Sequence, residues 1–140
     1  MTASPAPCPC GSALAYADCC ARFHGGALHL HAPTAEALMR SRYSAFVRGD
    51  HAYLLATWHP STRPAMLEPD PPGLKWLGLD VRRHTPHDDT HATVEFVARS
   101  KLGGRAQRLH EISRFVREDG RWFYVDAADD AQPGISSRTT

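Results

Sequence analysis

Alternating apolar and polar residues mark the C-terminal half of the chain as an antiparallel sheet. Residues 93–126 predict three strands, joined by two tight turns at Gly103-Gly104 and Asp119-Gly120. Asp-Gly is a strong signal for a two-residue hairpin, because a type I′ turn needs positive φ at both central positions. Side chains alternate with a period of two along a strand, so each turn also determines which residues share a face.

The second turn predicts the register of the last two strands. It sets Phe115 opposite Tyr124 and Ser113 opposite Asp126. We expect the face with most of the aromatic residues to point inward. Its members are Val94, Phe96, Ala98, Leu109, Glu111, Ser113, Phe115, Trp122, Tyr124 and Asp126. Two carboxylates and a hydroxyl group therefore fall on a face that is otherwise mostly apolar.

Apolar residues recur at helical spacing upstream of these strands. Thr34 is suited to cap a helix that ends at Gly49, and Asp50 to cap a second, shorter helix that runs to about Trp58. His59 precedes Pro60, and a residue before proline disfavours the helical conformation. The apolar stripe of the first helix contains Ala35, Leu38, Met39, Tyr43, Phe46 and Val47.

The segment between the helices and the meander is less regular. Residues 60–73 contain five prolines, which predicts an irregular connection. Residues 75–84 predict one more strand, in which Leu77, Leu79 and Val81 alternate, and residues 84–90 predict a polar turn. Two helices followed by a twisted antiparallel sheet predict an α+β fold. We expect the sheet to curve around the helices and form a cone with one open mouth.

This organisation suggests three parts. Residues 33–127 form the cone, residues 1–32 form a small cysteine-containing unit with a linker, and residues 128–140 form a polar, flexible tail. We expect the cone to bury its core without help from residues 1–32. A chain of 140 residues is otherwise one domain of ordinary size.

Composition limits the classes of partner and compartment. A formal net charge of +1 gives no electrostatic footprint for nucleic acid or for an anionic membrane. No apolar run approaches the roughly 18 residues that span a bilayer. The first seven residues lack the basic and apolar regions of a secretory signal, so we expect a cytoplasmic protein with reduced thiols.

Four cysteines are the clearest chemical signal in the chain. Cys8, Cys10, Cys19 and Cys20 form a C-x-C-x8-C-C pattern within 13 residues. Four soft ligands at this density favour a closed, structural zinc site in a reducing compartment. The alternatives are a disulfide or unrelated free thiols, and His24 offers an imidazole in place of one cysteine. None of these readings implies an open, catalytic coordination position.

The cysteine segment also resembles a known motif. Residues 8–20 are similar to the SEC-C zinc knuckle, and residues 40–43, 57–61 and 110–126 resemble the YchJ-like family of small bacterial proteins. That resemblance implies a knuckle joined to a nuclear-transport-factor-2-like cone, with no established activity. In the preprotein-translocase motor, the knuckle resembles a docking element for chaperone and ribosome. The positions that are usually lysine are Leu14, Ala15, Ala17 and Asp18 here, which argues against the same docking role.

The inward polar groups allow two interpretations. Burial raises the pKa of a carboxyl group and a nearby carboxylate raises it further, which is how a general acid or base is prepared. Alternatively, Arg40, Arg42 or a backbone cap neutralises the buried charge. His59, at the expected rim of the cone, is either a functional group or a partner of the last helical carbonyls. The pocket candidates are Trp58, His59, Glu111, Ser113, Tyr124 and Asp126.

Two functional hypotheses follow from these features. In the first, which we favour, the protein is an adaptor: the knuckle contacts a protein partner and the cone binds a small molecule or peptide. In the second, it is a proton-transfer enzyme of the isomerase or dehydratase type, with Glu111 or Asp126 as base and Ser113, Tyr124 or His59 orienting the substrate. The observation that separates them is whether the carboxylates line an open cavity or are tied to arginine.

Overall fold

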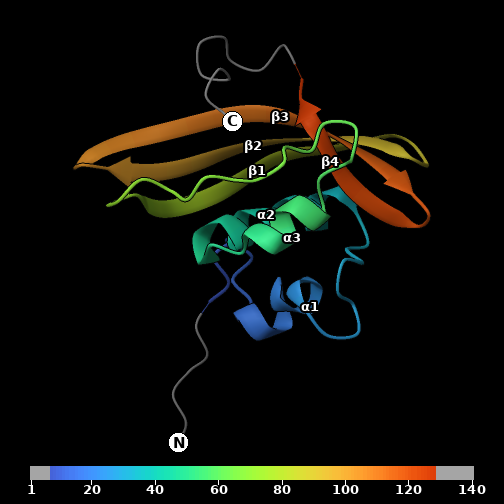
Figure 1. Cartoon of the computed structure of the whole chain (residues 1–140), viewed down its shortest axis with the longest axis horizontal. Helices are drawn as coiled ribbons and strands as arrows, with labels where there is room; N and C mark the ends of the chain where they lie inside the picture. Colours follow the sequence, from blue (N-terminus) through green and yellow to red (C-terminus); the bar gives the residue numbers. More distant parts are fainter. Residues whose placement is uncertain (1–6, 129–140) are drawn as a thin grey trace, which may run out of the picture.

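The computed structural model describes residues 7–128, which form a four-stranded antiparallel sheet, two central helices and an N-terminal knuckle. The sheet lies over one side of the helices, and the knuckle lies on their other side (Figure 1). The strand order is β1-β2-β3-β4. The bounds are Tyr16–Asp18 (a 3-10 turn), Ala21–His24 (α1), Ala35–Arg48 (α2), His51–Ala56 (α3), Lys75–Asp88 (β1), His91–Leu102 (β2), Arg105–Glu118 (β3) and Arg121–Ala127 (β4). The predicted α+β class with a curved antiparallel sheet is confirmed.

Local capping signals determine the two central helices. Thr34 Oγ1 accepts a hydrogen bond from the Ala37 amide at 3.0 Å, and Gly49 ends α2 with a φ of 71°. Asp50 Oδ1 accepts from the Tyr53 amide at 3.1 Å and so starts α3. Both helices therefore begin where their sequence signals predict.

The first strand differs from the prediction in two ways. It continues to Asp88, because residues 84–88 pair with β2 and do not form a separate polar turn. A register shift between Trp76 and Gly78 makes Leu77 an extra residue, so it is 56% exposed. Trp76 points inward instead, with its ring 5.7 Å from that of Tyr43. The predicted alternation of Leu77 with Leu79 and Val81 is therefore interrupted at Leu77.

The last hairpin contains a second irregularity that affects the site. Phe115 pairs with Tyr124 as predicted, but Arg114 pairs with Asp126, so Val125 is the extra residue of a β-bulge. Ser113 consequently lies opposite Ala127 and not opposite Asp126. A turn sets the register only as far as the first bulge, which is why this part of the prediction is wrong.

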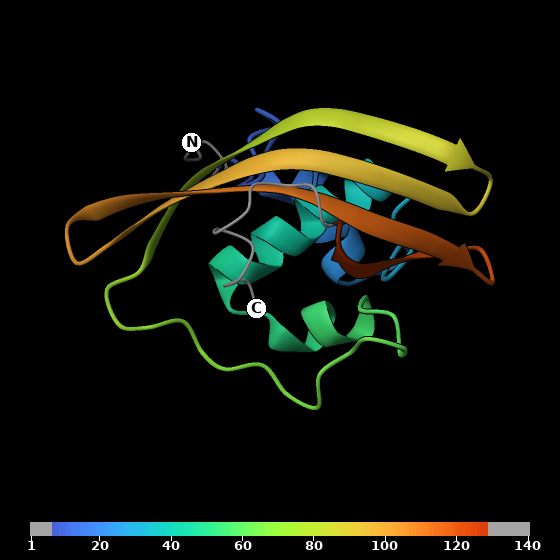
Figure 2. The same ribbon diagram turned by 90° about the horizontal axis from the view of Figure 1, so that it is seen from above.

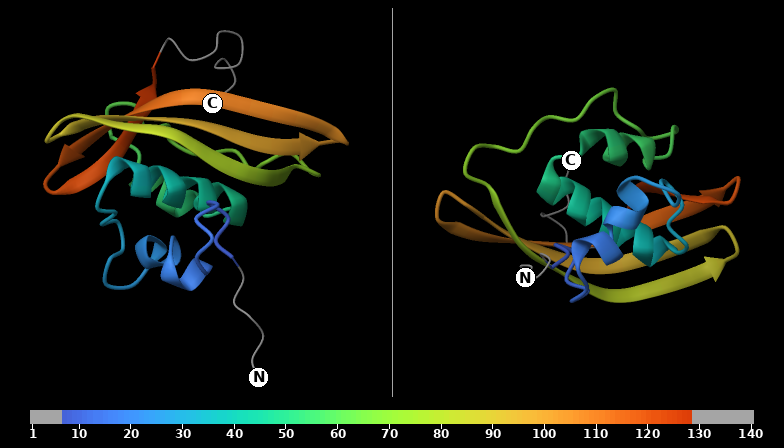
Figure 3. Two further views of the ribbon diagram at one scale, coloured as in Figure 1. Left: turned by 180° about the vertical axis from the view of Figure 1, so that it is seen from behind. Right: turned by 90° about the horizontal axis from the view of Figure 1, so that it is seen from below.

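The knuckle shares its core with the cone. Its four cysteines and Phe23 are each at most 7% exposed, and they belong to the same buried cluster as Leu38 and Phe115. Figure 3 shows most of the knuckle packed against the helices on the side away from the sheet, while Gly11 approaches Leu79 of β1. The knuckle and the cone therefore contribute to one common core, and the expectation that the cone buries its core without residues 1–32 stays a prediction. The division into parts at residue 32 stays a prediction, and the expected tail lies outside the described residues.

The proline-containing segment follows the edge of the helical layer. It leaves α3, passes the helices and returns to the start of β1 (Figure 2). Residues 60–73 contain neither helix nor strand, as their prolines predict. No helix in the described part of the chain is both long enough and apolar enough to cross a membrane.

Candidate functional site

The four cysteines converge on one buried point. Their sulfur atoms all lie within 4.8 Å of one another, with 3.6 Å between those of Cys10 and Cys19 and 4.0 Å between those of Cys19 and Cys20. All four are free thiols, so the disulfide alternative is wrong. A tetrahedral zinc–thiolate site with bonds of about 2.3 Å has sulfur–sulfur edges of about 3.8 Å. The cluster therefore has the dimensions that such an ion requires.

Electrostatics also favour a bound cation. Hydrogen bonding, chiefly with the Cys20 thiol, lowers the pKa of Cys10 to about 4. That interaction with Cys10, together with burial, raises the pKa of Cys20, and burial raises the pKa of Cys19. Without a cation, the ionised Cys10 therefore disfavours ionisation of Cys19 and Cys20. A divalent ion is the group that lets all four sulfurs bind as thiolates.

Polar groups from the knuckle and α2 hold the cysteines in place. Ser12 Oγ lies 3.1 Å from Cys19 Sγ, and Ser44 Oγ of α2 lies 3.4 Å from Cys8 Sγ. Arg40 Nη1 donates to the Cys10 carbonyl oxygen at 2.9 Å. These contacts orient the sulfur ligands and also fasten the knuckle to α2.

His24 has a different role from the one weighed from its sequence position. Its Nδ1 lies 2.6 Å from the Tyr16 hydroxyl, and its Nε2 lies 2.8 Å from the Ser41 carbonyl oxygen of α2. Both ring nitrogens therefore have partners, so His24 joins the knuckle to the helix. It is not among the metal-ligand candidates in the described residues.

A cavity of about 480 Å³ lies between the other side of α2 and the inner face of the sheet. Its wall is mostly apolar, and this volume is typical of a small-molecule site. The lining residues are Met39, Arg42, Tyr43, Phe46, Trp58, Asp70, Leu74, Trp76, Phe96, Ala98, Leu109, Glu111, Ser113, Tyr124 and Ala127. Of the six sequence-predicted candidates, the structure brings Trp58, Glu111, Ser113 and Tyr124 together here.

Glu111 is the buried carboxyl group of this cavity. It is 6% exposed, and its Oε2 accepts a hydrogen bond from Ser113 Oγ at 2.6 Å. Burial raises the pKa of Glu111, while the Ser113 hydrogen bond and the charge of Arg42 partly oppose that change. No ion pair within 4.0 Å joins Glu111 to an arginine among residues 7–128. The carboxyl group therefore lines an open cavity and is not locked in a salt bridge.

Arg42 is the buried cation of the same cavity. It is 4% exposed, and its Nη1 donates to the Leu54 carbonyl oxygen at 2.8 Å and to Thr57 Oγ1 at 2.7 Å. Its guanidinium carbon lies 4.6 Å from the ring centre of Tyr124 and 5.2 Å from that of Trp58. Burial lowers the pKa of Arg42 to about 10, so the group stays charged at neutral pH. The surroundings therefore disfavour the charged form by roughly 3 kcal/mol.

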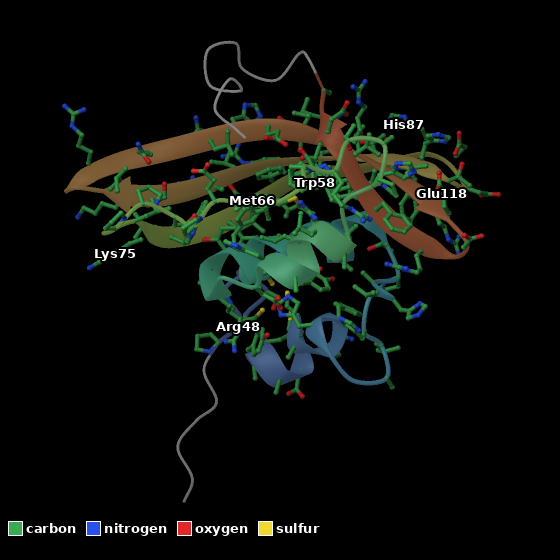
Figure 4. The ribbon with its side chains drawn as sticks, viewed as in Figure 1. Arg48, Trp58, Met66, Lys75, His87 and Glu118 are labelled. Carbon is green, nitrogen blue, oxygen red and sulfur yellow. The ribbon has the colours of Figure 1, made fainter. Side chains whose placement is uncertain are left out.

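Two further hydrogen-bond donors lie beside Arg42, and neither has an acceptor among the described residues. Trp58 lies between α3 and the sheet (Figure 4), and its Nε1–H is buried without a hydrogen-bond acceptor. The Tyr124 hydroxyl makes none of the hydrogen bonds found among the described residues, and burial raises its pKa. A buried donor without an acceptor destabilises the protein by about 1–3 kcal/mol. The cavity thus contains more donors than acceptors.

Asp126 does not reach this cavity. The Val125 bulge turns it to the outer face of the sheet, where Arg114 Nε and Nη2 donate to its two carboxylate oxygens at 2.7 and 2.9 Å. Ala127 lines the cavity in its place. The expected pair of inward carboxylates is therefore wrong, because one residue is inserted between the turn and Asp126.

His59 also lies apart from the cavity lining. Its Nε2 is 2.9 Å from Glu118 Oε2, and its Nδ1 is 2.7 Å from Ser61 Oγ. Its amide donates to the Tyr124 carbonyl oxygen at 2.8 Å. These contacts fasten the end of α3 to the β3–β4 hairpin, so His59 has a structural position here.

Sequence reasoning missed most of the helical wall of the cavity. Met39, Arg42, Tyr43 and Phe46 recur at the spacing of one helix face, so an arginine inside an apolar stripe was visible in the sequence. We considered Arg42 only as a neutralising partner for a carboxylate. The bulge at Leu77 sets the direction of Trp76, and the one sequence signal for it is Gly78, since a glycine inside a strand often marks a bulge.

Comparison with protein families supports both parts of this description. Residues 34–127 match the profile of the YchJ middle NTF2-like domain, and residues 5–22 match the SEC-C motif. The "UPF0225 protein BPP1723" of Bordetella parapertussis is 64% identical over 123 residues, which are 88% of this chain and 92% of that protein. The "UPF0225 protein Mpe_A2093" of Methylibium petroleiphilum is 64% identical over 127 residues, which are 91% of each chain.

Two solved structures share the arrangement. A SEC-C motif containing protein from Rhodopseudomonas palustris, RPA3114, has a TM-score of 0.76 and 34% identity, covering 87% of this chain and 97% of its own. A sec-c motif containing protein from Psychrobacter arcticus has a TM-score of 0.72 and 32% identity, covering 96% of this chain and 85% of its own. With matching profiles over both the knuckle and the cone, this chain belongs to the YchJ-like family of SEC-C and NTF2-like proteins.

Proposed function

We propose that this protein is a binding module in which a zinc-stabilised knuckle supports a cone that binds a small, largely apolar molecule. The observation that carries the proposal is the 480 Å³ cavity, whose apolar wall contains a few convergent polar groups. Arg42 and Glu111 are buried in that wall without forming an ion pair within 4.0 Å. Burying such groups is costly, and a ligand that binds them offsets that cost.

The knuckle has a supporting role in this proposal. Four thiolates suit zinc, and a reducing compartment such as the cytoplasm keeps them available. Leu14, at the outer side of the knuckle, is 52% exposed and offers apolar surface to a protein partner. Contact with such a partner would make the protein an adaptor.

A thermal-shift screen with small apolar acids, alcohols and amines tests the binding proposal. Ala127→Leu adds bulk inside the cavity, whereas the matched Ala106→Leu adds it at an exposed position of β3. We expect ligands to raise the melting temperature of the wild type and of Ala106→Leu, but to raise that of Ala127→Leu much less. Equal shifts in the two variants, or no shift in the wild type, would contradict the proposal.

Proton transfer is the second candidate, and the raised pKa of Glu111 favours it. Of the two carboxylates predicted as bases, Glu111 lines the cavity and Asp126 lies on the other face of the sheet. Cavity ligands with an acidic C–H bond should then exchange that hydrogen with D2O in the presence of the wild type. Glu111→Gln should bind them without catalysing exchange, while a purely binding protein gives no exchange in either form.

A further inference from the structure

We propose that the cavity selects ligands that carry a carboxylate group, and that Arg42 binds this group. This inference rests on the proposed function, namely that the cavity binds a small molecule. It adds the chemical class of the ligand and names the residue that recognises it.

The hydrogen bonds of Arg42 leave part of its guanidinium group available. Both of its bonds to described residues come from Nη1, which leaves Nε and Nη2 without a partner in residues 7–128. The Leu54 carbonyl and Thr57 Oγ1 hold the group in one orientation, and the rings of Trp58 and Tyr124 pack around it. A preorganised guanidinium with a free Nε–Nη2 edge is suited to bind a carboxylate by two parallel hydrogen bonds.

The surroundings of Arg42 lack a competing anion at contact distance. The ion pairs of the described residues do not include Arg42, and Asp126 is held by Arg114 on the opposite face. Glu111 is the carboxyl group whose charge acts on Arg42, and burial raises the pKa of Glu111. Asp70 also lines the cavity, but it accepts a hydrogen bond from Trp76 Nε1 at 3.1 Å and forms no ion pair with Arg42. An anionic ligand therefore supplies the carboxylate partner that Arg42 lacks at contact distance.

The neighbouring groups provide donors and an apolar envelope. The Tyr124 hydroxyl and the Trp58 Nε1–H have no acceptors among the described residues, and Ser113 Oγ already donates to Glu111. A ligand that brings two oxygen acceptors complements a site with excess donors. The rest of the wall contains Met39, Phe46, Trp76 and Phe96, which suits an aliphatic or aromatic body on the same molecule.

A charge series on one alkyl chain tests this proposal. Octanoate, 1-octanol and octylammonium are titrated separately into the full-length, metal-loaded protein at pH 7 and followed by calorimetry. We expect octanoate to bind roughly tenfold or more tightly than 1-octanol, because it gains a charge-assisted pair of hydrogen bonds. Octylammonium should bind most weakly, since it meets the Arg42 charge.

Variants of Arg42 and Glu111 separate recognition from folding. Arg42→Lys keeps the charge and loses the planar fork, so octanoate should lose several-fold more affinity than 1-octanol does. Arg42→Met removes the charge and should abolish the preference for octanoate. Because Arg42→Met also loses two buried hydrogen bonds and risks unfolding, Glu111→Gln provides an independent test in a variant that keeps the hydrogen bond with Ser113.

Glu111→Gln mimics the neutral carboxyl group at every pH. It should bind octanoate at least as tightly as the wild type at pH 6 and at pH 8, with any gain larger at pH 8. The other titratable groups that line the cavity are Tyr43, Asp70 and Tyr124, and Asp126 acts on Glu111 from the opposite face. The matched variants Asp70→Asn and Asp126→Asn should leave the difference between octanoate and 1-octanol in place.

The outcomes distinguish this proposal from the proposed function. If octanoate and 1-octanol bind equally, or if Glu111→Gln binds octanoate more weakly than the wild type, the cavity binds ligands but does not select carboxylates. If octylammonium binds most tightly, Glu111 and not Arg42 is the recognition group. If none of the three compounds binds, the proposed function fails together with this inference.

Discussion

The two sides of α2 contain buried polar groups in different states. On the knuckle side, Ser44 contacts Cys8 of the cysteine cluster and the Ser41 carbonyl oxygen contacts His24, so these polar groups have hydrogen-bond partners. On the cavity side, Arg42 and Glu111 are equally buried but do not reach each other, and neighbouring donors have no acceptors. One helix therefore separates a site whose groups are complete once a metal is bound from a site whose groups remain available.

This difference shows how burial alone fails to identify function. Both sites shift pKa values, since burial and close neighbours act on Cys20 and on Glu111 alike. The distinction lies in the space beside the groups. The cysteine sulfurs surround a volume of atomic size, whereas the polar groups of the cone border a cavity of about 480 Å³.

Metal removal should have the largest effect on the protein. The cysteines belong to the same core as α2 and the sheet, so we expect chelation, or Cys20→Ser, to unfold the cone as well as the knuckle. The free energy of binding of structural zinc is about 10–16 kcal/mol, which is comparable to the stability of a whole domain. Circular dichroism measures the loss of folded structure and metal analysis the loss of the ion. Added Zn²⁺ should restore the folded structure of the chelated protein.

If the cone stays folded after the metal is removed, the two sides of α2 are stable independently of each other. If strand signals in the NMR spectrum persist after the metal is removed, the knuckle is an independent unit. The boundary near residue 32 would then be a true domain boundary, as the sequence suggests.

Gly11→Ala should have the next largest effect, because it disturbs the contact between the knuckle and the sheet. Gly11 has a φ of +84°, and an added Cβ would lie 3.1 Å from the Leu79 carbonyl oxygen of β1. Gly26→Ala is a matched control, with a φ of +81° and open space around the added atom. Chemical denaturation should show a loss of about 1–2 kcal/mol for the control, from backbone strain, and a larger loss for Gly11→Ala. Equal losses would mean that this contact does not constrain the knuckle.

Glu111→Gln should change how stability depends on pH. Burial raises the pKa of Glu111 above its ordinary value of 4.5, so the folded state binds more protons than the unfolded state above that pH. The wild type therefore loses stability as pH rises from about 4.5 through the pKa of the folded state, whereas the glutamine variant does not. Each unit of pKa difference corresponds to about 1.4 kcal/mol.

Denaturation of both proteins between pH 4 and pH 8 measures this difference. The variant should gain stability relative to the wild type as the pH rises. A constant difference would mean that Glu111 titrates at the same pH in both states, and its place in the cavity would then lack the desolvation that we describe.

Asp126→Asn should have the smallest effect. The residue pairs with Arg114 at the surface of the sheet, and exposed ion pairs contribute about 0–1 kcal/mol. Thermal denaturation should show a small loss, and the affinity of the cavity for octanoate should change little. A large loss of affinity would place Asp126 in the cavity and would contradict the bulge at Val125.

Much of the fold and part of the site were predictable because their signals are local. Thr34, Gly49 and Asp50 act on the backbone within one helical turn, and Asp119-Gly120 acts within one hairpin. The four cysteines are close in sequence, so their convergence depended only on a short loop. Glu111 and Ser113 were placed inward correctly because no bulge lies between them and the turn at Gly103-Gly104.

What only the tertiary structure decided depends on contacts between distant segments. The bulge at Val125 has no glycine or proline beside it, and the bulge at Leu77 has only Gly78 as a local signal. These bulges determine that Trp76 and Ala127 line the cavity while Asp126 does not. The sequence by itself determined that Arg42 lies on an apolar helical stripe and that the cysteines form a cluster. Packing the sheet and the knuckle on opposite sides of α2 decided that one group of buried polar residues is closed and the other is open, because burial and pairing depend on all the layers together.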